Sequence, residues 1–123
     1  MGVALLRQGD ALIAAIQSDL TDAEVLQLRD ELTEQVGRER LRSIIIDVSA
    51  LDVIDSFVAR ALRGMAIGVR LRGAKTLVVG IQPDVAIAMA HFDLNLAPLL
   101  TATDLGEALA LVERATEVDG GDG

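Results

Sequence analysis

The hydrophobic and polar positions of the chain follow two spacings, which predict strands in some segments and helices in others. Two apolar runs, residues 3–8 and 11–17, open the sequence. The pair Gly9-Asp10 separates them and suits the positive backbone angles of a tight hairpin turn. The first two segments are therefore predicted to form an antiparallel hairpin.

A helix is predicted directly after the hairpin. Thr21 and Glu24 have the spacing of a capping box, in which each side chain accepts a hydrogen bond from the other residue's backbone N–H. Behind them, apolar residues recur at helical intervals: Val25, Leu28, Leu32 and Val36. The helix is expected to end near Gly37 because glycine favours helix ends.

The middle of the chain alternates between strand and helix. Residues 43–48 form an unbroken β-branched run, the pattern of a central strand covered on both faces. Residues 75–81 have the same character, and the segment 56–72 between them carries one apolar stripe at helical spacing. A further helix is predicted to begin at Pro83, a residue suited to the first turn.

The last elements complete a single-domain prediction. A short strand is expected at 99–102, and a final helix follows Asp104, with Glu107 at capping distance. The order predicts one α/β domain over residues 1–118, with a mixed sheet that starts in the hairpin, continues in parallel strands and is covered by about four helices. Residues 119–123 are expected to be a disordered tail.

Composition excludes several classes of protein. The chain has 123 residues, 51% hydrophobic and 24% charged, which is enough for one packed core. Without cysteine it has no disulfide framework, thiolate nucleophile or zinc-thiolate site. The lone His91 argues against a histidine-rich metal centre. Neither a cofactor nor a metal ion is therefore expected.

Charge and hydropathy limit the classes of partner that the protein can have. The net charge of −8 repels nucleic-acid backbones, and only Phe57 and Phe92 could stack on bases. No apolar run approaches the roughly 20 residues of a membrane span. The start of the sequence lacks a basic leader with a long apolar stretch. The protein is therefore expected to be cytoplasmic, with no nucleic-acid and no membrane partner.

Two enzyme hypotheses fail on these residues. A hydrolase would need Ser56 or Ser49 as nucleophile with His91 as base, yet no Gly-x-Ser-x-Gly elbow exposes either serine. A phosphoaspartate site at Asp47 would need a lysine at the carboxyl end of a later strand. The only lysine, Lys75, opens its strand instead. No enzymatic activity is expected.

Unlike the residues of these two enzyme hypotheses, the segment 47–57 places a serine hydroxyl at a helix start, next to acidic residues. The structural interpretation is that Asp55 or Ser56 caps the helix and contributes about 1 kcal/mol. The functional interpretation is that the exposed amides and positive dipole end would accommodate a phosphate on Ser56. On these residues alone both interpretations stay open, and capping is the commoner role.

The segment 47–65, with Asp55-Ser56 at its centre, resembles the STAS domain of anti-sigma factor antagonists. The stretch 78–86 narrows the resemblance to the RsbS-type scaffold proteins of the bacterial stressosome, and the similarity spans residues 3–118. The resemblance implies that Ser56 is phosphorylated by a switch kinase of histidine-kinase-like ATPase fold and dephosphorylated by a PP2C-type phosphatase.

Residues around this serine refine the expectation. Many simple antagonists have Ser and Gly after the target serine, whereas Phe57 and Val58 follow here, which favours the scaffold branch. Ser49 is the fallback phosphorylation site.

Partner contacts are expected near this helix start. Arg60, Arg63 and Arg70 lie on roughly one helical face, as either a solvated surface or a docking strip for an acidic partner. The residues expected to contact a partner are Asp52, Asp55, Phe57, Arg60 and Arg63.

The resemblance thus implies a non-enzymatic phosphoswitch scaffold. It would hold the kinase in a large assembly with sensor STAS paralogues and further copies of itself, and release the kinase when Ser56 is phosphorylated. The alternative is a soluble antagonist that binds an anti-sigma kinase directly. A third class, a small-ligand-binding domain, would need a pocket that a sequence cannot display.

Overall fold

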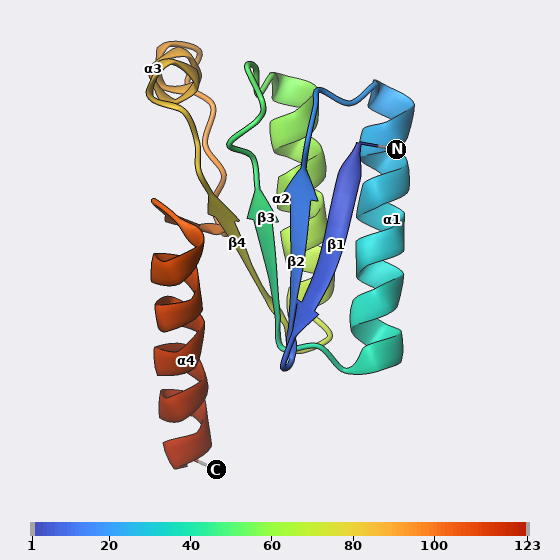
Figure 1. Ribbon diagram of the computed structural model, residues 1–123, viewed down its shortest axis with the longest axis vertical. Helices are drawn as coiled ribbons and strands as arrows, with labels where there is room; N and C mark the ends of the chain where they lie inside the picture. The colour runs from blue at the N-terminus through green and yellow to red at the C-terminus, as the bar shows by residue number, and fades with distance from the viewer. Residues whose placement is uncertain (1, 123) are drawn as a thin grey trace.

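The computed structural model describes the backbone of residues 2–122 and the side chains of residues 2–113. Five strands form one sheet in the order β1-β2-β3-β4-β5, and four helices surround it (Figure 1). The elements are β1 (Val3–Gln8), β2 (Ala11–Ile16), α1 (Asp22–Glu39), β3 (Ser43–Asp47), α2 (Ser56–Arg70), β4 (Lys75–Val79), α3 (Pro83–His91), β5 (Leu100–Ala102) and α4 (Leu105–Asp122).

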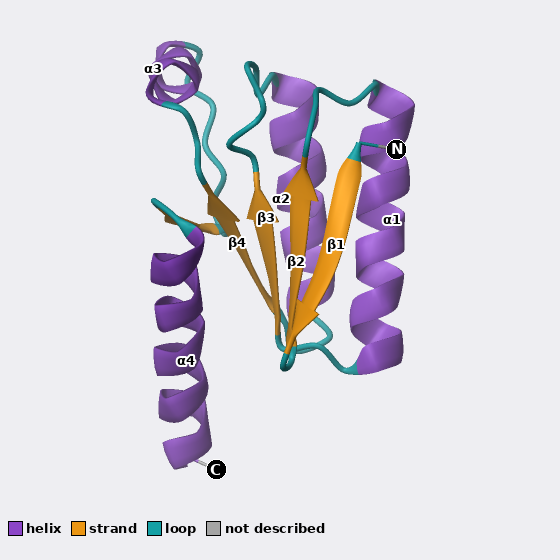
Figure 2. Ribbon diagram, viewed as in Figure 1, coloured by secondary structure: helices purple, strands orange, loops and turns teal. Residues whose placement is uncertain are grey.

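The sheet confirms the predicted α/β class and its mixed topology. Strands β1 and β2 pair antiparallel, with Val3 opposite Ile16, and every later pairing is parallel. Gly9 in the connecting turn has a φ of 62°, a conformation that glycine adopts without steric cost. Because the parallel strands end at the same edge, the loops that follow β2, β3 and β4 gather there (Figure 2).

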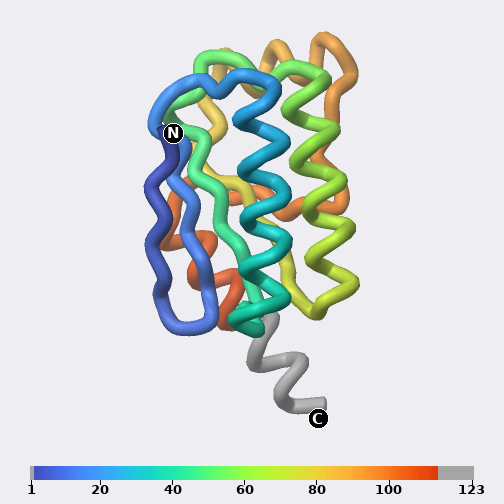
Figure 3. The backbone as a smooth tube through the Cα atoms, turned by 90° about the vertical axis from the view of Figure 1, so that its right-hand side faces the viewer, coloured from blue at the N-terminus to red at the C-terminus, as the bar shows by residue number. Residues whose placement is uncertain are grey.

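The helices form layers on either side of the sheet. Helices α1 and α2 lie side by side over one face, and α4 lies over the other (Figure 3). The larger hydrophobic core fills the α1–α2 side, and a smaller cluster packs beneath α4. Helix α3 stands beyond the carboxyl end of β4, where it can help to form a surface near the start of α2 (Figure 1).

Helix α1 begins as predicted but ends later than expected. The hydroxyl of Thr21 accepts from the backbone N–H of Glu24, and the Glu24 carboxylate accepts from the N–H of Thr21. The helix passes Gly37 and ends at Glu39, where Arg40 takes the left-handed cap with a φ of 53°. Gly37 is an interior residue of this helix, and the guanidinium of Arg72 lies over the space that a side chain there would occupy.

Two other boundaries differ from the sequence prediction by two residues, and the remaining strand ends differ by at most one. Strand β4 ends at Val79, two residues early, because Gly80 turns the chain with a φ of 78°. Helix α2 ends at Arg70, also two residues early.

The end of the chain completes the description. The backbone of α4 is helical to Asp122, but the domain boundary at 118 and the disorder expected for 119–123 lie outside the residues whose side chains are described, and both stay predictions. Within the part of the chain that the structure describes, none of the helices combines the length and apolar character needed to cross a membrane.

Candidate functional site

Ser56 is the first residue of α2, and its side chain is exposed. The preceding residue, Asp55, has extended backbone angles, and its Oδ1 accepts a hydrogen bond of 2.9 Å from the N–H of Val58. Asp55 is therefore the N-cap, which resolves the choice between Asp55 and Ser56 that the sequence left open. The cap does not use the Ser56 hydroxyl.

The electrostatics at this helix start work in two directions. The first N–H groups of a helix lack partners within the helix, and they carry the positive end of its dipole. The first turn of α2 contains no acidic side chain. A phosphate on Ser56 would be stabilised by these amides. Exposed Asp52 and Asp55 in the preceding loop would oppose the same phosphate by charge repulsion.

The loop before α2 is held by contacts at both ends. The Asp47 carboxylate at the end of β3 accepts from the N–H of Ser49 at 2.9 Å. The Gln82 side-chain amide donates to the Ser49 carbonyl at 2.8 Å and ties the loop to the β4–α3 connection. Leu51 and Ile54 are 4% exposed and anchor the loop in the core. Ser56 is thus presented from a fixed position.

A shallow apolar hollow, called here the α3 hollow, lies beside Ser56. Val53 and Phe92 contribute exposed apolar surface to it and are 61% and 72% exposed. Its lining residues are Asp52, Val53, Ile54, Asp55, Ser56, Val85, Ala88, Phe92 and Leu94. The hollow joins a serine, two carboxylates and an apolar surface, a combination suited to docking another protein.

The predicted partner residues are only partly brought together. Asp52 and Asp55 line the α3 hollow with Ser56. Phe57 is half-buried and lies outside that lining. Arg60 is exposed one turn beyond Ser56. The Nε of Arg63 donates to the backbone carbonyl of Ala97 at 3.1 Å, so this arginine also supports the α3–β5 connection.

The residues that sequence reasoning missed come from α3 and the segment after it. Val85 is buried beneath this helix, whereas Ala88 and Phe92 are exposed. The available signal was the position of a large aromatic residue at the end of a nine-residue helix. What the sequence could not show is that the loop before Ser56 lies against the same surface.

His91, the base that a hydrolase would need, and the side chains that could bind a metal ion have ordinary structural surroundings in the described part of the chain. His91 lies in the last turn of α3, and its ring meets that of Phe92 edge-on at 5.4 Å. Across residues 2–113, side chains of His, Cys, Asp and Glu form no group of three that could hold a metal ion. The site consists of a hydroxyl, carboxylates and an apolar surface.

The comparisons with known proteins match the sequence and the fold of this chain to one family. The profile of the STAS domain matches residues 3–108. RsbS of Moorella thermoacetica, solved as a Ser-to-Glu variant, is 30% identical and superposes with a TM-score of 0.79, covering 94% of this chain and 97% of that one. A chain of the solved stressosome, a signal integration and transduction hub, is 28% identical to this chain. It superposes with a TM-score of 0.71, covering 92% of this chain and 98% of that one.

A curated relative matches over a shorter range. The RsbT co-antagonist protein RsbRA of Bacillus subtilis (strain 168) is 26% identical over 91 residues, which are 74% of this chain and 33% of that protein. The chain thus spans about a third of the length of the first curated relatives that it matches.

Proposed function

The chain belongs to the STAS domain family, and from this membership we propose that it is a non-enzymatic phosphoswitch scaffold of a bacterial stress-signalling assembly. In its unmodified form it holds a serine/threonine switch kinase of histidine-kinase-like ATPase fold. Phosphorylation of Ser56 releases the kinase, and a PP2C-type phosphatase restores binding. Stressosome and anti-sigma antagonist proteins share this fold, which supports the signalling role.

One observation carries the proposal: Asp55 makes the cap and Ser56 is exposed beside it. A serine that served as the cap would turn its oxygen toward the helix amides. Here a carboxylate takes that position, and Ser56 is exposed and lines the α3 hollow. A kinase docked on this surface would meet the hydroxyl at the edge of its contact area.

Release follows from where the new charge falls. A phosphate adds roughly −1.5 to −2 charges, and a helix start stabilises an anion by about 0.3 to 1 kcal/mol. Repulsion from Asp52 and Asp55 opposes this gain, so the folded monomer changes little in stability. At a docked surface the same charge is desolvated, where like-charge contact costs several kcal/mol. The switch therefore acts on binding.

The relatives support a role in an assembly. RsbS and a chain of the stressosome resemble this chain over nearly their whole length, and RsbRA is a co-antagonist of RsbT. We infer that this chain assembles with further copies of itself and with sensor STAS paralogues.

The phosphorylation site is tested by intact mass. Incubation with the kinase and ATP should add one phosphate to the natural chain and none to Ser56→Ala. Ser49→Ala serves as the matched control, because Ser49 is the other exposed serine of this region and the fallback site. Equal phosphate on Ser56→Ala and none on Ser49→Ala would move the target to Ser49.

The assembly role is tested by particle size. A scaffold should elute in very large particles when mixed with sensor STAS paralogues, and phosphorylation should remove only the kinase from them. A direct antagonist would instead form a small complex with an anti-sigma kinase and no large particle. Sedimentation of the mixtures distinguishes the two outcomes.

A further inference from the structure

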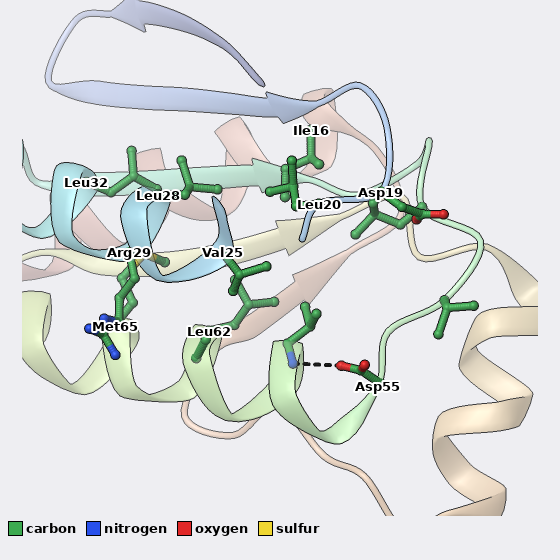
Figure 4. A pocket seen from close by; sticks show the side chains of 14 residues that line it. Ile16, Asp19, Leu20, Val25, Leu28, Arg29, Leu32, Asp55, Leu62 and Met65 are labelled. Atoms are coloured by element: carbon green, nitrogen blue, oxygen red, sulfur yellow. Dashed lines mark hydrogen bonds between the residues drawn. The ribbon is translucent and has the colours of Figure 1, made fainter. Parts of the chain in front are cut away.

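A second cavity lies between α1 and α2, on the other side of the loop that precedes Ser56 (Figure 4). We propose that this cavity, called here the interhelix pocket, binds a small apolar molecule that carries one hydrogen-bond donor, an amino or a hydroxyl group. The existence of the pocket does not depend on the proposed function. Only its effect on the phosphorylation of Ser56 rests on that function.

Size and lining favour an apolar ligand. The interhelix pocket has a volume of about 230 Å³. A core cavity of about 150 Å³ lined by similar side chains is large enough for benzene or xenon. Most of the wall consists of buried apolar side chains from both helices, which include Val25, Leu28, Leu32, Ala61, Leu62 and Met65. A ligand of one ring or a short branched chain would fill this space.

The polar groups of the wall are unevenly placed. Asp19 and Asp55 lie toward the loops at one end, whereas Arg29 lies toward the other end beside Met65 (Figure 4). The guanidinium of Arg29 pairs with the neighbouring Asp30 carboxylate at 2.9 Å, and both side chains are exposed, so this charge lies at the solvent side and away from the loop end. The two carboxylates accept hydrogen bonds and repel anions. A donor head group at the loop end therefore fits, and a carboxylate head group does not.

The same residues connect the pocket to the start of α2. Asp55, the N-cap, lines both the interhelix pocket and the α3 hollow, and so does Val53. Val58, whose N–H donates to Asp55, also lines the pocket. A ligand whose head group meets Asp55 would therefore hold the loop that presents Ser56. If the proposed function holds, occupancy should change the rate at which Ser56 is phosphorylated.

Three probes of matched shape test the ligand chemistry: cyclohexylmethylamine, cyclohexylmethanol and cyclohexanecarboxylate. Titration followed by methyl NMR should give saturable shifts of Leu28, Leu62 and Met65 with the amine and the alcohol. The carboxylate should bind at least tenfold more weakly. Absence of saturable shifts with both donors, or carboxylate binding as tight as theirs, would overturn the proposal.

Two sets of variants locate the binding. Ala61→Leu fills the pocket from α2, and Val58→Phe closes its mouth if the first variant does not fold. Either should weaken the amine and the alcohol at least tenfold. Unchanged affinity in a folded, filled variant would show that the probes bind elsewhere, which includes the α3 hollow, and would refute the assignment.

The carboxylates are tested with a charge-matched control. Asp19→Asn with Asp55→Asn keeps the cap, because asparagine caps as well as aspartate, but removes both charges. Amine affinity should fall about tenfold, while alcohol affinity should change less than about twofold. Asp52→Asn with Asp84→Asn changes the net charge equally outside the pocket and should leave both unchanged. Equal losses in the two double variants would refute the role of the pocket carboxylates.

The coupling to Ser56 is measured separately. The phosphorylation rate is compared with and without saturating cyclohexylmethanol, in the natural chain and in Ala61→Leu. A change of at least twofold that disappears in the filled variant supports the coupling. Proven binding with an unchanged rate would overturn the coupling, and loss of all phosphorylation on Ser56 would instead overturn the proposed function.

Discussion

Helices α1 and α2 lie side by side and begin at the same edge of the sheet, but their first turns are built differently. At α1 the hydroxyl of Thr21 and the carboxylate of Glu24 each accept from the other's backbone N–H. At α2 the Asp55 carboxylate alone accepts from the N–H of Val58, and the hydroxyl of Ser56 has no part in the cap.

The difference shows how a local capping choice determines whether a hydroxyl can serve a second purpose. The Thr21 oxygen is committed to the helix, because losing it leaves an amide without a partner. The Ser56 hydroxyl makes no hydrogen bond of the cap, so a phosphate on it breaks none of the bonds that cap α2. We infer that the start of α1 is purely structural, whereas the start of α2 combines a structural aspartate with a switchable serine.

The largest change should come from charge placed on Ser56. Ser56→Asp supplies one negative charge and a shape unlike phosphate, so it should weaken kinase binding by about tenfold, less than phosphorylation itself. Thr21→Asp, which also places a carboxylate at a capping position, is the control and should leave kinase affinity unchanged. Calorimetry of the kinase complex measures both, and equal weakening would erase the distinction between the two helix starts.

Charge reversal on the exposed face of α2 should have the next largest effect. Arg60→Glu should slow kinase association severalfold at low salt, and the difference should shrink as salt screens it. Arg63→Glu should do the same but also lower the free energy of unfolding, because it loses the bond to the Ala97 carbonyl. Stopped-flow association and thermal unfolding separate these effects. Kinase affinity that stays unchanged at low salt would make the arginines an ordinary solvated surface.

Removing the α2 cap should cost about 1 kcal/mol of unfolding free energy. Asp55→Ala leaves the Val58 N–H without its acceptor, whereas Asp55→Asn keeps the cap and should cost only a few tenths. Denaturant unfolding compares the two variants. A loss of similar size in both would mean that the charge of Asp55, rather than its capping oxygen, stabilises the helix.

The smallest effect is a pH dependence at the start of α1. Hydrogen bonds from the Thr21 N–H and hydroxyl lower the pKa of the Glu24 carboxyl below its ordinary value. A lowered folded-state pKa stabilises the protein above the unfolded pKa, and that stabilisation is lost as pH falls through the folded pKa. Between pH 7 and pH 3, the free energy of unfolding should fall slightly less for Glu24→Gln than for the natural chain. Glutamine keeps the capping box but cannot titrate. Identical curves would contradict this contribution.

Most of the fold was predictable because its signals are local. The capping spacing of Thr21 and Glu24 gave the start of α1, and the β-branched run gave β3. The end of α1 lies two residues beyond Gly37, because this glycine continues the helix instead of ending it. The guanidinium that lies over Gly37 belongs to Arg72, 35 positions later in the sequence, and the local pattern gives no sign of it.

The candidate site was predictable only in its serine and the loop before it. The position of Ser56 at a helix start followed from local spacing, but Asp55 as the cap required the dihedral angles of the structure. The α3 hollow and the interhelix pocket lay beyond sequence reasoning because each is lined by segments distant in the chain. Such surfaces depend on how the loops meet above the sheet.

In the proposed mechanism, phosphorylation of Ser56 acts at the kinase interface and leaves the fold nearly unchanged. The melting temperature and the kinase affinity are therefore compared between the unmodified and the fully phosphorylated chain. We expect a kinase affinity lowered by about 10-fold to 1,000-fold, with almost the same melting temperature. A large drop in melting temperature with little loss of affinity would contradict it and indicate that the phosphate acts by changing the conformation.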